Sequence, residues 1–551
     1  MSRAERFAAN DRGPAWVAAP VLGVLLVYCW CYTNMAVWLG LPTPAAVGQF
    51  FDLALPRVID ADGNVAAKLY VSHTSRLDGD DERAIGFAAL FGGFLGAYFS
   101  PLRYRAWSAV GWFFAAFAWL YGVDAALVVL AAHLTVYLAF HPHRGDGAAA
   151  VLGGALAWLA GVVWAVPAAA AAGVLLVRRL ARAANGRVAA LVRACVVHAC
   201  MLTIAVACVR EGLTGAAWKL PVGLVFFFYQ WARVLVYRAD VRDGLVPREL
   251  SVAAYLAIFL SPLALFNLAY APYLGQAHAY LQARHLREGK SALVLSGVRL
   301  WCLALVYMVF AEQVVAWFIA AIGQVFDIKV YAFTSELVRE FLEGERVSTP
   351  TVLLSTLVDQ ARIFLIYGGV THFRVGAWRV MGYAVDTQYD RPWLATNLAN
   401  LWGRFAFHFR EFLVRVFYYP VFLKFFRKRA LLRIFAATMV ATVLGNWIWG
   451  HVPPRTITRL TWEDLMVILS TWPYFVLLGL GISLTQIYLA RRPRTRRPWT
   501  WDRWFCVDLV CCYLTLQYFA LIHVFVRPQP GGTLGDLAEL VLIGVGVRLG
   551  D

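Results

Sequence analysis

The residues that could carry out chemistry gather in one stretch of this sequence, residues 386–451. Two histidines lie within it, His408 near its middle and His451 at its end. An imidazole is the side chain best suited to act as a general base near neutral pH. Asn446 and Trp447 carry N–H donors of the kind that stabilise a developing oxyanion. The stretch therefore holds side chains that could accept a proton from a substrate or donate hydrogen bonds to it.

The segment that holds His408, residues 398–425, carries charges that a lipid-facing helix would not tolerate. A charged side chain at the centre of a bilayer costs about 2.5 to 3.5 kcal/mol on insertion scales. Arg404 lies four residues before His408 and Glu411 lies three residues after it, so on one continuous helix the three polar groups share a face. We expect the segment either to lie in the membrane interface as an amphipathic helix or to re-enter the membrane beside a water-filled cavity.

Each candidate also has a plainer interpretation. His451 directly precedes Val-Pro-Pro, which is typical of a helix end, and a helix of about eighteen residues would place it roughly 27 Å along, close to the far interface. His408 is the kind of residue that neighbouring charges satisfy, and His372 the kind that lies at a membrane boundary. Trp402 and Arg404 are also explained as anchors of their segment. Both interpretations stay open for each residue.

The rest of the chain must supply the elements that hold this stretch, and its composition indicates a membrane protein. Of 551 residues, 61% are hydrophobic and only 15% are charged, which leaves more apolar surface than a soluble core can bury. We therefore predict an all-α, polytopic integral membrane protein with about 11–13 transmembrane or re-entrant helices. The first span is expected at residues 14–39, and an acidic loop at residues 52–85.

Three segments are expected along the chain. Residues 1–214 should hold N-terminal transmembrane helices, residues 215–490 a core with the chemical stretch, and residues 491–551 a basic link with C-terminal transmembrane helices. Further apolar spans are expected at residues 86–100, 107–140, 149–177, 190–209, 216–237, 251–275, 294–323, 352–371, 431–451, 463–490 and 503–526.

The net charge of +17 is explained by the membrane rather than by nucleic acid. Arginines gather in short links between apolar spans, where the positive-inside rule and anionic headgroups favour them. The densest link, residues 491–503, is expected on the cytoplasmic side. The nine cysteines show no metal-ligand spacing with histidine, so no metal site is predicted. The motifs of phosphate-binding loops, zinc proteases and serine hydrolases are absent from the sequence.

Four motifs occur in order across roughly residues 215–490. They are PVGLVFFFYQWARVLVYRADVRDG at 221–244, YGGVTHFRVGAWRVMGY at 367–383, Leu401-Trp402-Gly403-Arg404-Phe405-Ala406 running on to Tyr418-Tyr419-Pro420, and Gly445-Asn446-Trp447-Ile448-Trp449-Gly450-His451. In order and spacing they resemble the motifs of the membrane-bound O-acyltransferase (MBOAT) family, in the bacterial branch that includes the alginate O-acetylation and teichoic-acid D-alanylation proteins.

The resemblance implies transfer of an acyl group, with acetyl expected, from a thioester donor to a hydroxyl of a cell-envelope glycan or lipid. No bound cofactor is implied, and acyl-CoA or an acyl-carrier thioester would be the co-substrate. The implied partners are the lipid bilayer, the donor, the acceptor and other proteins of an envelope-modification system, and the implied location is the cytoplasmic membrane of a bacterium, crossed several times. The implied catalytic residues are His451 and then His408, and the implied substrate-binding residues are Trp402, Arg404, Asn446, Trp447 and His372.

Two departures from the family pattern bear on this expectation. The family places a histidine where this sequence has Ile448, and a second polar residue where it has Ala406. His451 lies three residues after Ile448, one turn along the same face of an α-helix. His408 lies two residues after Ala406, so on a helix it would point about 200° away.

Two other function classes stay open. A catalytically inactive relative that acts as a scaffold in envelope assembly would explain the two apolar positions. A transporter of small solutes or lipids has the same hydropathy. It would be expected to show paired discontinuous helices in two related halves, which the sequence does not indicate.

Overall fold

The computed structural model describes residues 100–101, 104–141, 186–214, 219–246, 250–260, 289–380, 385–451, 469–491, 505–526 and 532–548. Every regular element in these parts of the chain is a helix, and they contain no strand. The predicted all-α fold class is therefore confirmed. The span expected at 14–39, the acidic loop, the span at 149–177 and most of the span at 86–100 lie outside the described residues.

Six helices in the described parts are long and apolar enough to cross a membrane. Each falls on a span expected from the hydropathy of the sequence, which supports a polytopic membrane protein. The six cover Val123–Phe140, Ala190–Glu211, Thr349–Gly369, Ala430–Trp449, Trp472–Arg491 and Phe505–Val526.

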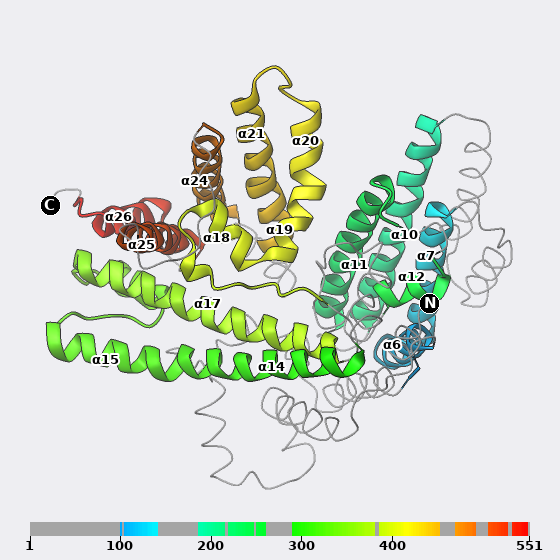
Figure 1. Ribbon diagram of the computed structural model, residues 1–551, viewed down its shortest axis with the longest axis horizontal. Helices are drawn as coiled ribbons and strands as arrows, with labels where there is room; N and C mark the ends of the chain where they lie inside the picture. The colour runs from blue at the N-terminus through cyan, green and yellow to red at the C-terminus, as the bar shows by residue number, and fades with distance from the viewer. Residues whose placement is uncertain are drawn as a thin grey trace, which may run out of the picture. The chain divides into compact units, whose positions relative to one another are not determined.

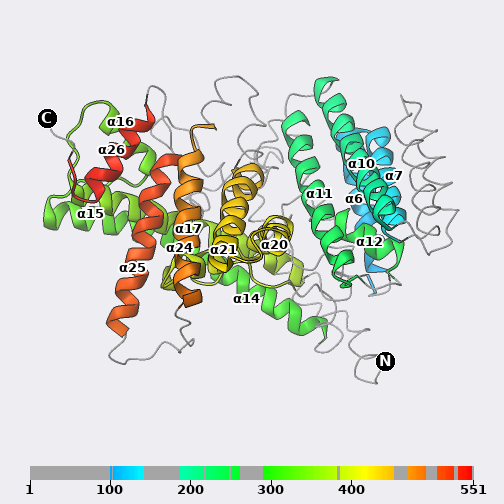
Figure 2. The same ribbon diagram turned by 90° about the horizontal axis from the view of Figure 1, so that it is seen from above.

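The chain forms two compact units whose segments alternate along the sequence, and unit 1 comprises residues 1–44, 71–299 and 374–385. In it α10 lies along both α7 and α11 (Figure 2). Gly122 has a φ of 88°, which favours glycine, and it splits the single span expected at 107–140 into α6 and α7. The described helices of this unit are α6 (Arg105–Tyr121), α7 (Val123–Phe140), α10 (Gly186–Thr214), α11 (Lys219–Arg242), α12 (Val252–Phe259) and the first half of α14 (Lys290–Val309) (Figure 1).

Unit 2 comprises residues 45–70, 300–373 and 386–551 and holds the chemical stretch. Within it α24 lies between α21 and α25 (Figure 2). Besides the end of α14, its described helices are η5 (Phe310–Val314), α15 (Val315–Phe326), α16 (Thr334–Leu342), α17 (Thr349–Val380, whose last residues belong to unit 1), η6 (Pro392–Leu394), α18 (Leu398–Phe405), α19 (Phe407–Leu413), η7 (Val414–Tyr418), α20 (Tyr419–Lys424), α21 (Ala430–Met439), η8 (Val440–His451), α24 (Trp472–Arg491), α25 (Phe505–Ile522), η9 (His523–Val526) and α26 (Leu534–Gly544).

The helix expected at 431–451 changes type along its length. It begins as α21 and continues as the π-helix η8, which ends at His451. Hydrogen bonds in a π-helix run from residue i to i+5, so each turn holds more than four residues. Positions three apart then do not stack, and the argument that placed His451 on the face of Ile448 does not hold in this helix. With more than four residues per turn, the residue one turn before His451 is Trp447 rather than Ile448.

Candidate functional site

A break in the helix separates residues that were expected to share one face. α18 ends at Ala406, whose backbone angles of φ −144° and ψ 62° are not helical, and α19 begins directly after it. Arg404 and His408 therefore lie on different helices, and the expectation of a common face is wrong for this pair. His408 and Glu411 remain three residues apart on α19.

The extended segment before α18 stabilises this break with backbone hydrogen bonds. The Asp390 N–H donates to the Arg404 carbonyl at 2.9 Å, and the Phe407 N–H donates to the Gln388 carbonyl at 3.0 Å. These groups flank Ala406, so each finds a backbone partner although the helix is interrupted. The break is therefore built by a segment fourteen residues upstream of Arg404.

Arg404 anchors the same segment through its side chain. Its Nε donates to the Asn400 side-chain oxygen at 2.9 Å, and one terminal nitrogen donates to the Asp390 carboxylate at 3.2 Å. The Arg404 and Asp390 side chains are 24% and 65% exposed, so solvent screens the pair and limits it to about 1 kcal/mol. Trp402 is buried with its ring edge-on to Phe409. Both residues thus contribute contacts that hold α18 in place.

His408 is the most deeply buried polar residue of this stretch. It is 1% exposed, and neither ring nitrogen has a hydrogen-bond partner among the described residues. Burial lowers the pKa of His408 to about 3, and the nearby Asp386 backbone offsets only part of this lowering. The imidazole is therefore neutral at physiological pH and is a weaker base than an exposed histidine. The neighbouring charges do not satisfy it, because Glu411 pairs with Arg410.

The helix η8, which carries the Gly445–His451 motif, packs directly on α19, the helix that carries His408. A Cβ added to Gly445 of η8 would lie 2.8 Å from Leu413 and 2.9 Å from Phe417, so a glycine is needed for this close approach. Trp449 of η8 is buried, and its ring lies edge-on to Phe412 of α19 with 5.6 Å between centroids. The structure therefore brings together the third and fourth of the four motifs, residues 401–420 and 445–451.

The residues of η8 differ in the direction they face. Asn446 is buried, while Trp447 is half-buried with an indole Nε1 that has no hydrogen-bond partner among the described residues. Ile448 is 38% exposed, so the position where the family has its histidine faces outward here. The backbone of His451 ends η8, and its side chain lies outside the described residues. Asn446 and Trp447, the residues predicted to donate to an oxyanion, thus both lie on η8.

His372 is buried in an aromatic cluster inside the protein. Its ring is 5.4 Å from the Tyr307 ring and 5.8 Å from the Tyr389 ring, centroid to centroid. A Cβ on Gly368, one turn earlier, would meet these tyrosine rings at 2.8 and 2.9 Å, so the glycine lets them pack against α17. Trp393 is edge-on to both tyrosines. This aromatic cluster joins α17 to the segment before α18.

Sequence analysis missed buried polar residues in α17, because the span is apolar on average. The Asp359 carboxylate accepts a hydrogen bond from the Thr334 N–H at 3.2 Å, and the Arg362 guanidinium lies 3.9 Å from the centre of the Phe333 ring. Gln360 is buried with no hydrogen-bond partner for its amide among the described residues. Asp-Gln-x-Arg in an apolar span was the available signal, since such residues mark functional or tightly packed places in membranes.

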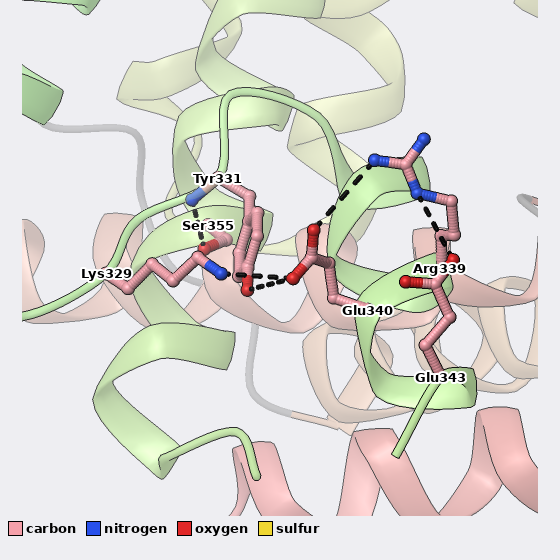
Figure 3. Close-up of polar contacts among 6 residues, drawn as sticks. All are labelled: Lys329, Tyr331, Arg339, Glu340, Glu343 and Ser355. Atoms are coloured by element: carbon pink, nitrogen blue, oxygen red, sulfur yellow. Dashed lines mark hydrogen bonds and ion pairs between the residues drawn. The ribbon is translucent and has the colours of Figure 1, made fainter. Parts of the chain in front are cut away.

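The link between α15 and α16 is tied to α17 by polar contacts (Figure 3). The Tyr331 N–H donates to the Ser355 hydroxyl at 2.9 Å, and Lys329 donates to the Glu340 carboxylate at 3.0 Å. Hydrogen bonds with Tyr331 and Glu340 raise the pKa of Lys329 above its usual value, and Lys329 lowers the pKa of Glu340. The Lys329 side chain is exposed, so these contacts position the link and carry no chemistry.

Comparison with known proteins adds no relative. No model of a known protein family matches the chain, and no curated protein is similar to it. Within the described residues, no group of three or more histidine, cysteine, aspartate or glutamate side chains gathers where it could hold a metal ion.

Proposed function

We propose that this chain is a membrane-bound O-acyltransferase of a bacterial cytoplasmic membrane. It transfers an acyl group, with acetyl expected, from acyl-CoA or an acyl-carrier thioester to a hydroxyl of a cell-envelope glycan or lipid. The observation that carries the proposal is the close packing of η8 on α19. This packing sets the Gly445–His451 motif beside the helix of the buried His408.

The proposed reaction needs one base and a pair of donors. An imidazole, His451 in the leading assignment and His408 in the second, accepts the proton of the acceptor hydroxyl as its oxygen attacks the thioester carbonyl. Asn446 and Trp447 donate hydrogen bonds to the resulting oxyanion. Collapse of the intermediate forms the ester and breaks the carbon–sulfur bond, and the imidazolium returns its proton to the departing thiolate. Burial keeps the His408 imidazole neutral but lowers its pKa to about 3, which makes it a weak base at neutral pH and favours His451 as the leading assignment.

The test is the acyl content of the envelope in cells that carry the intact gene, a deletion, or the His451→Ala variant. Esters are released with mild alkali and quantified. The proposal expects the deletion to lose a class of envelope esters and the intact chain to restore it, with His451→Ala failing to do so. Full restoration by His451→Ala would remove this residue from the mechanism and leave His408 as the remaining base. Unchanged esters in the deletion would contradict the proposal.

An inactive scaffold in envelope assembly is the second candidate, and one observation favours it. Neither position at which the family keeps its acid–base groups can move a proton here, because Ile448 and Ala406 have apolar side chains without a titratable group. Under this alternative, variants that lack both His408 and His451 would restore envelope assembly as fully as the intact chain. The proposed enzyme predicts that they fail to restore the esters.

A further inference from the structure

The turn between α20 and α21 carries an exposed group of basic and aromatic side chains, residues 423–429, which we name the basic–aromatic tip. Its sequence is Leu-Lys-Phe-Phe-Arg-Lys-Arg, and all seven residues are exposed. α20 and α21 lie side by side as a hairpin with this tip at its end (Figure 1). No acidic residue occurs between Glu411 and Glu463, so no nearby carboxylate in sequence offsets the four positive charges.

The backbone of the tip is ordered and presents its aromatic rings to the outside. Phe426 has a φ of 49°, a left-handed conformation that a bulky residue rarely adopts. Two hydrogen bonds hold the turn, from the Arg429 N–H to the Phe426 carbonyl at 2.9 Å and from the Arg427 side chain to the Leu423 carbonyl at 3.0 Å. Phe425 and Phe426 remain 56% and 48% exposed. The turn thus keeps two phenylalanine rings on the surface next to cations.

The position of the tip along the chain places it at the edge of the lipid. The candidate membrane span Ala430–Trp449 begins at the residue directly after the tip. A span of twenty residues is about 30 Å long, which matches the hydrocarbon core, so its first residue lies near the headgroups. Arg433 lies one turn into the span, and its guanidinium sits 4.1 Å from the centre of the Phe422 ring on α20.

We propose that the basic–aromatic tip binds the headgroups of anionic phospholipids. Arg427, Lys428 and Arg429 face the lipid phosphates, and Phe425 and Phe426 enter the boundary between headgroups and acyl chains. The basic side chains, the exposed phenylalanine rings and the position of the tip at the start of a candidate membrane span all favour an anionic phospholipid as the ligand. A soluble anion would bind the basic side chains but would leave both phenylalanine rings in water. A phospholipid accounts for both the basic side chains and the exposed rings. This binding is independent of acyl transfer.

The test measures phosphatidylglycerol and phosphatidylcholine retained by the purified full-length chain, using native mass spectrometry over a lipid titration. Each Lys or Arg near an anionic lipid surface is worth about 1 kcal/mol, or about fivefold in affinity. The double variant Lys428→Gln/Arg429→Gln should therefore bind phosphatidylglycerol about thirtyfold more weakly. Phosphatidylcholine binding should change much less. The matched control Arg210→Gln/Arg242→Gln removes two exposed charges from unit 1 and should behave as the wild type.

A second measurement needs no variant. Wild-type retention of phosphatidylglycerol should fall between about 0.15 and 1 M salt, because the Debye length shortens from about 8 to 3 Å. Equal retention of both lipids by the wild type, or an equal loss in the control variant, would overturn the proposal. Displacement of the lipid by free coenzyme A would assign the tip to a soluble anion and would overturn it as well.

Discussion

His408 of unit 2 differs in its hydrogen bonding from two histidines of unit 1, His141 and His198. In unit 1 the His141 Nε2 lies 2.6 Å from the Tyr237 hydroxyl, and the His198 Nδ1 accepts a hydrogen bond from the Trp231 indole at 3.2 Å. In unit 2 both nitrogens of His408 lack a partner among the described residues. A buried polar group without a partner costs about 1–3 kcal/mol. His141 and His198 gain hydrogen bonds that stabilise the fold, whereas the ring nitrogens of His408, like the Nε2 of His133 in unit 1, gain none among the described residues.

The largest effect on acyl transfer should appear when His408 and His198 are each replaced by alanine and the two variants are compared. If His408, the second assignment, is the base, His408→Ala lowers the rate of acyl transfer at least about 100-fold, because general acid–base groups contribute about 100- to 10,000-fold. His198→Ala should leave this rate within about twofold of the wild type. The measurement is the initial rate of acyl transfer in membranes that hold equal amounts of each folded variant. Equal losses of acyl-transfer rate in both variants would show that His408 has no special role in the reaction.

The pH dependence of stability should set His408 apart in the same way. Its folded pKa of about 3 lies below its ordinary value of 6.5, so the unfolded chain binds more protons. The contribution of His408 to the free energy of unfolding is complete above pH 6.5. It is lost as pH falls toward 3, by at most about 1.4 kcal/mol per pH unit. His408→Gln should flatten the fall in unfolding free energy over this window. Parallel curves for wild type and variant would contradict the buried, neutral state.

A substitution at the packing contact between η8 and α19 should have a smaller effect, measured as a change in the free energy of unfolding. Gly445→Ala places a methyl group 2.8 Å from Leu413, and overpacking of this kind costs typically 1–3 kcal/mol. Gly111→Ala has nothing within 4 Å and should stabilise its helix by roughly 0.5–1 kcal/mol. Denaturant unfolding in detergent compares the two. If Gly445→Ala is as stable as Gly111→Ala, the close packing of η8 on α19 is not present.

The smallest effect is expected at the exposed ion pair that anchors α18. A double-mutant cycle with Arg404→Gln and Asp390→Asn should give a coupling free energy of about 0.2–1 kcal/mol, because solvent screens the pair. A coupling above about 3 kcal/mol would mean that Arg404 is buried and central rather than an anchor. The readout is the unfolding free energy of the four proteins under one condition.

Much of the fold follows from the sequence because lipid imposes a simple rule on it. Apolar segments of about twenty residues must form helices in a bilayer, and all six candidate membrane helices lie where hydropathy predicted them. The sequence also placed His408, Asn446 and Trp447 in one stretch, and the structure brings their two helices together.

The local geometry of the site could not be predicted, because it depends on groups distant in the sequence. The break at Ala406 is stabilised by backbone groups of Gln388 and Asp390, which no helical pattern reveals. The π-helix η8 changes which positions share a face, and hydropathy does not distinguish it from an α-helix. The cluster around His372 depends on a close contact at Gly368, whose only sequence signal is a glycine in an apolar helix.

The most direct test of the central claim is acyl transfer by the purified full-length chain in liposomes. Radiolabelled acetyl-CoA serves as the donor and an isolated bacterial envelope fraction as the acceptor, with His408→Gln, His451→Ala and the control His198→Ala assayed beside the wild type. The account predicts alkali-labile label on the envelope fraction with wild type and His198→Ala, and loss of at least about 100-fold in the variant that lacks the base. Label no higher than in protein-free liposomes, or equal label with all four proteins, would contradict it.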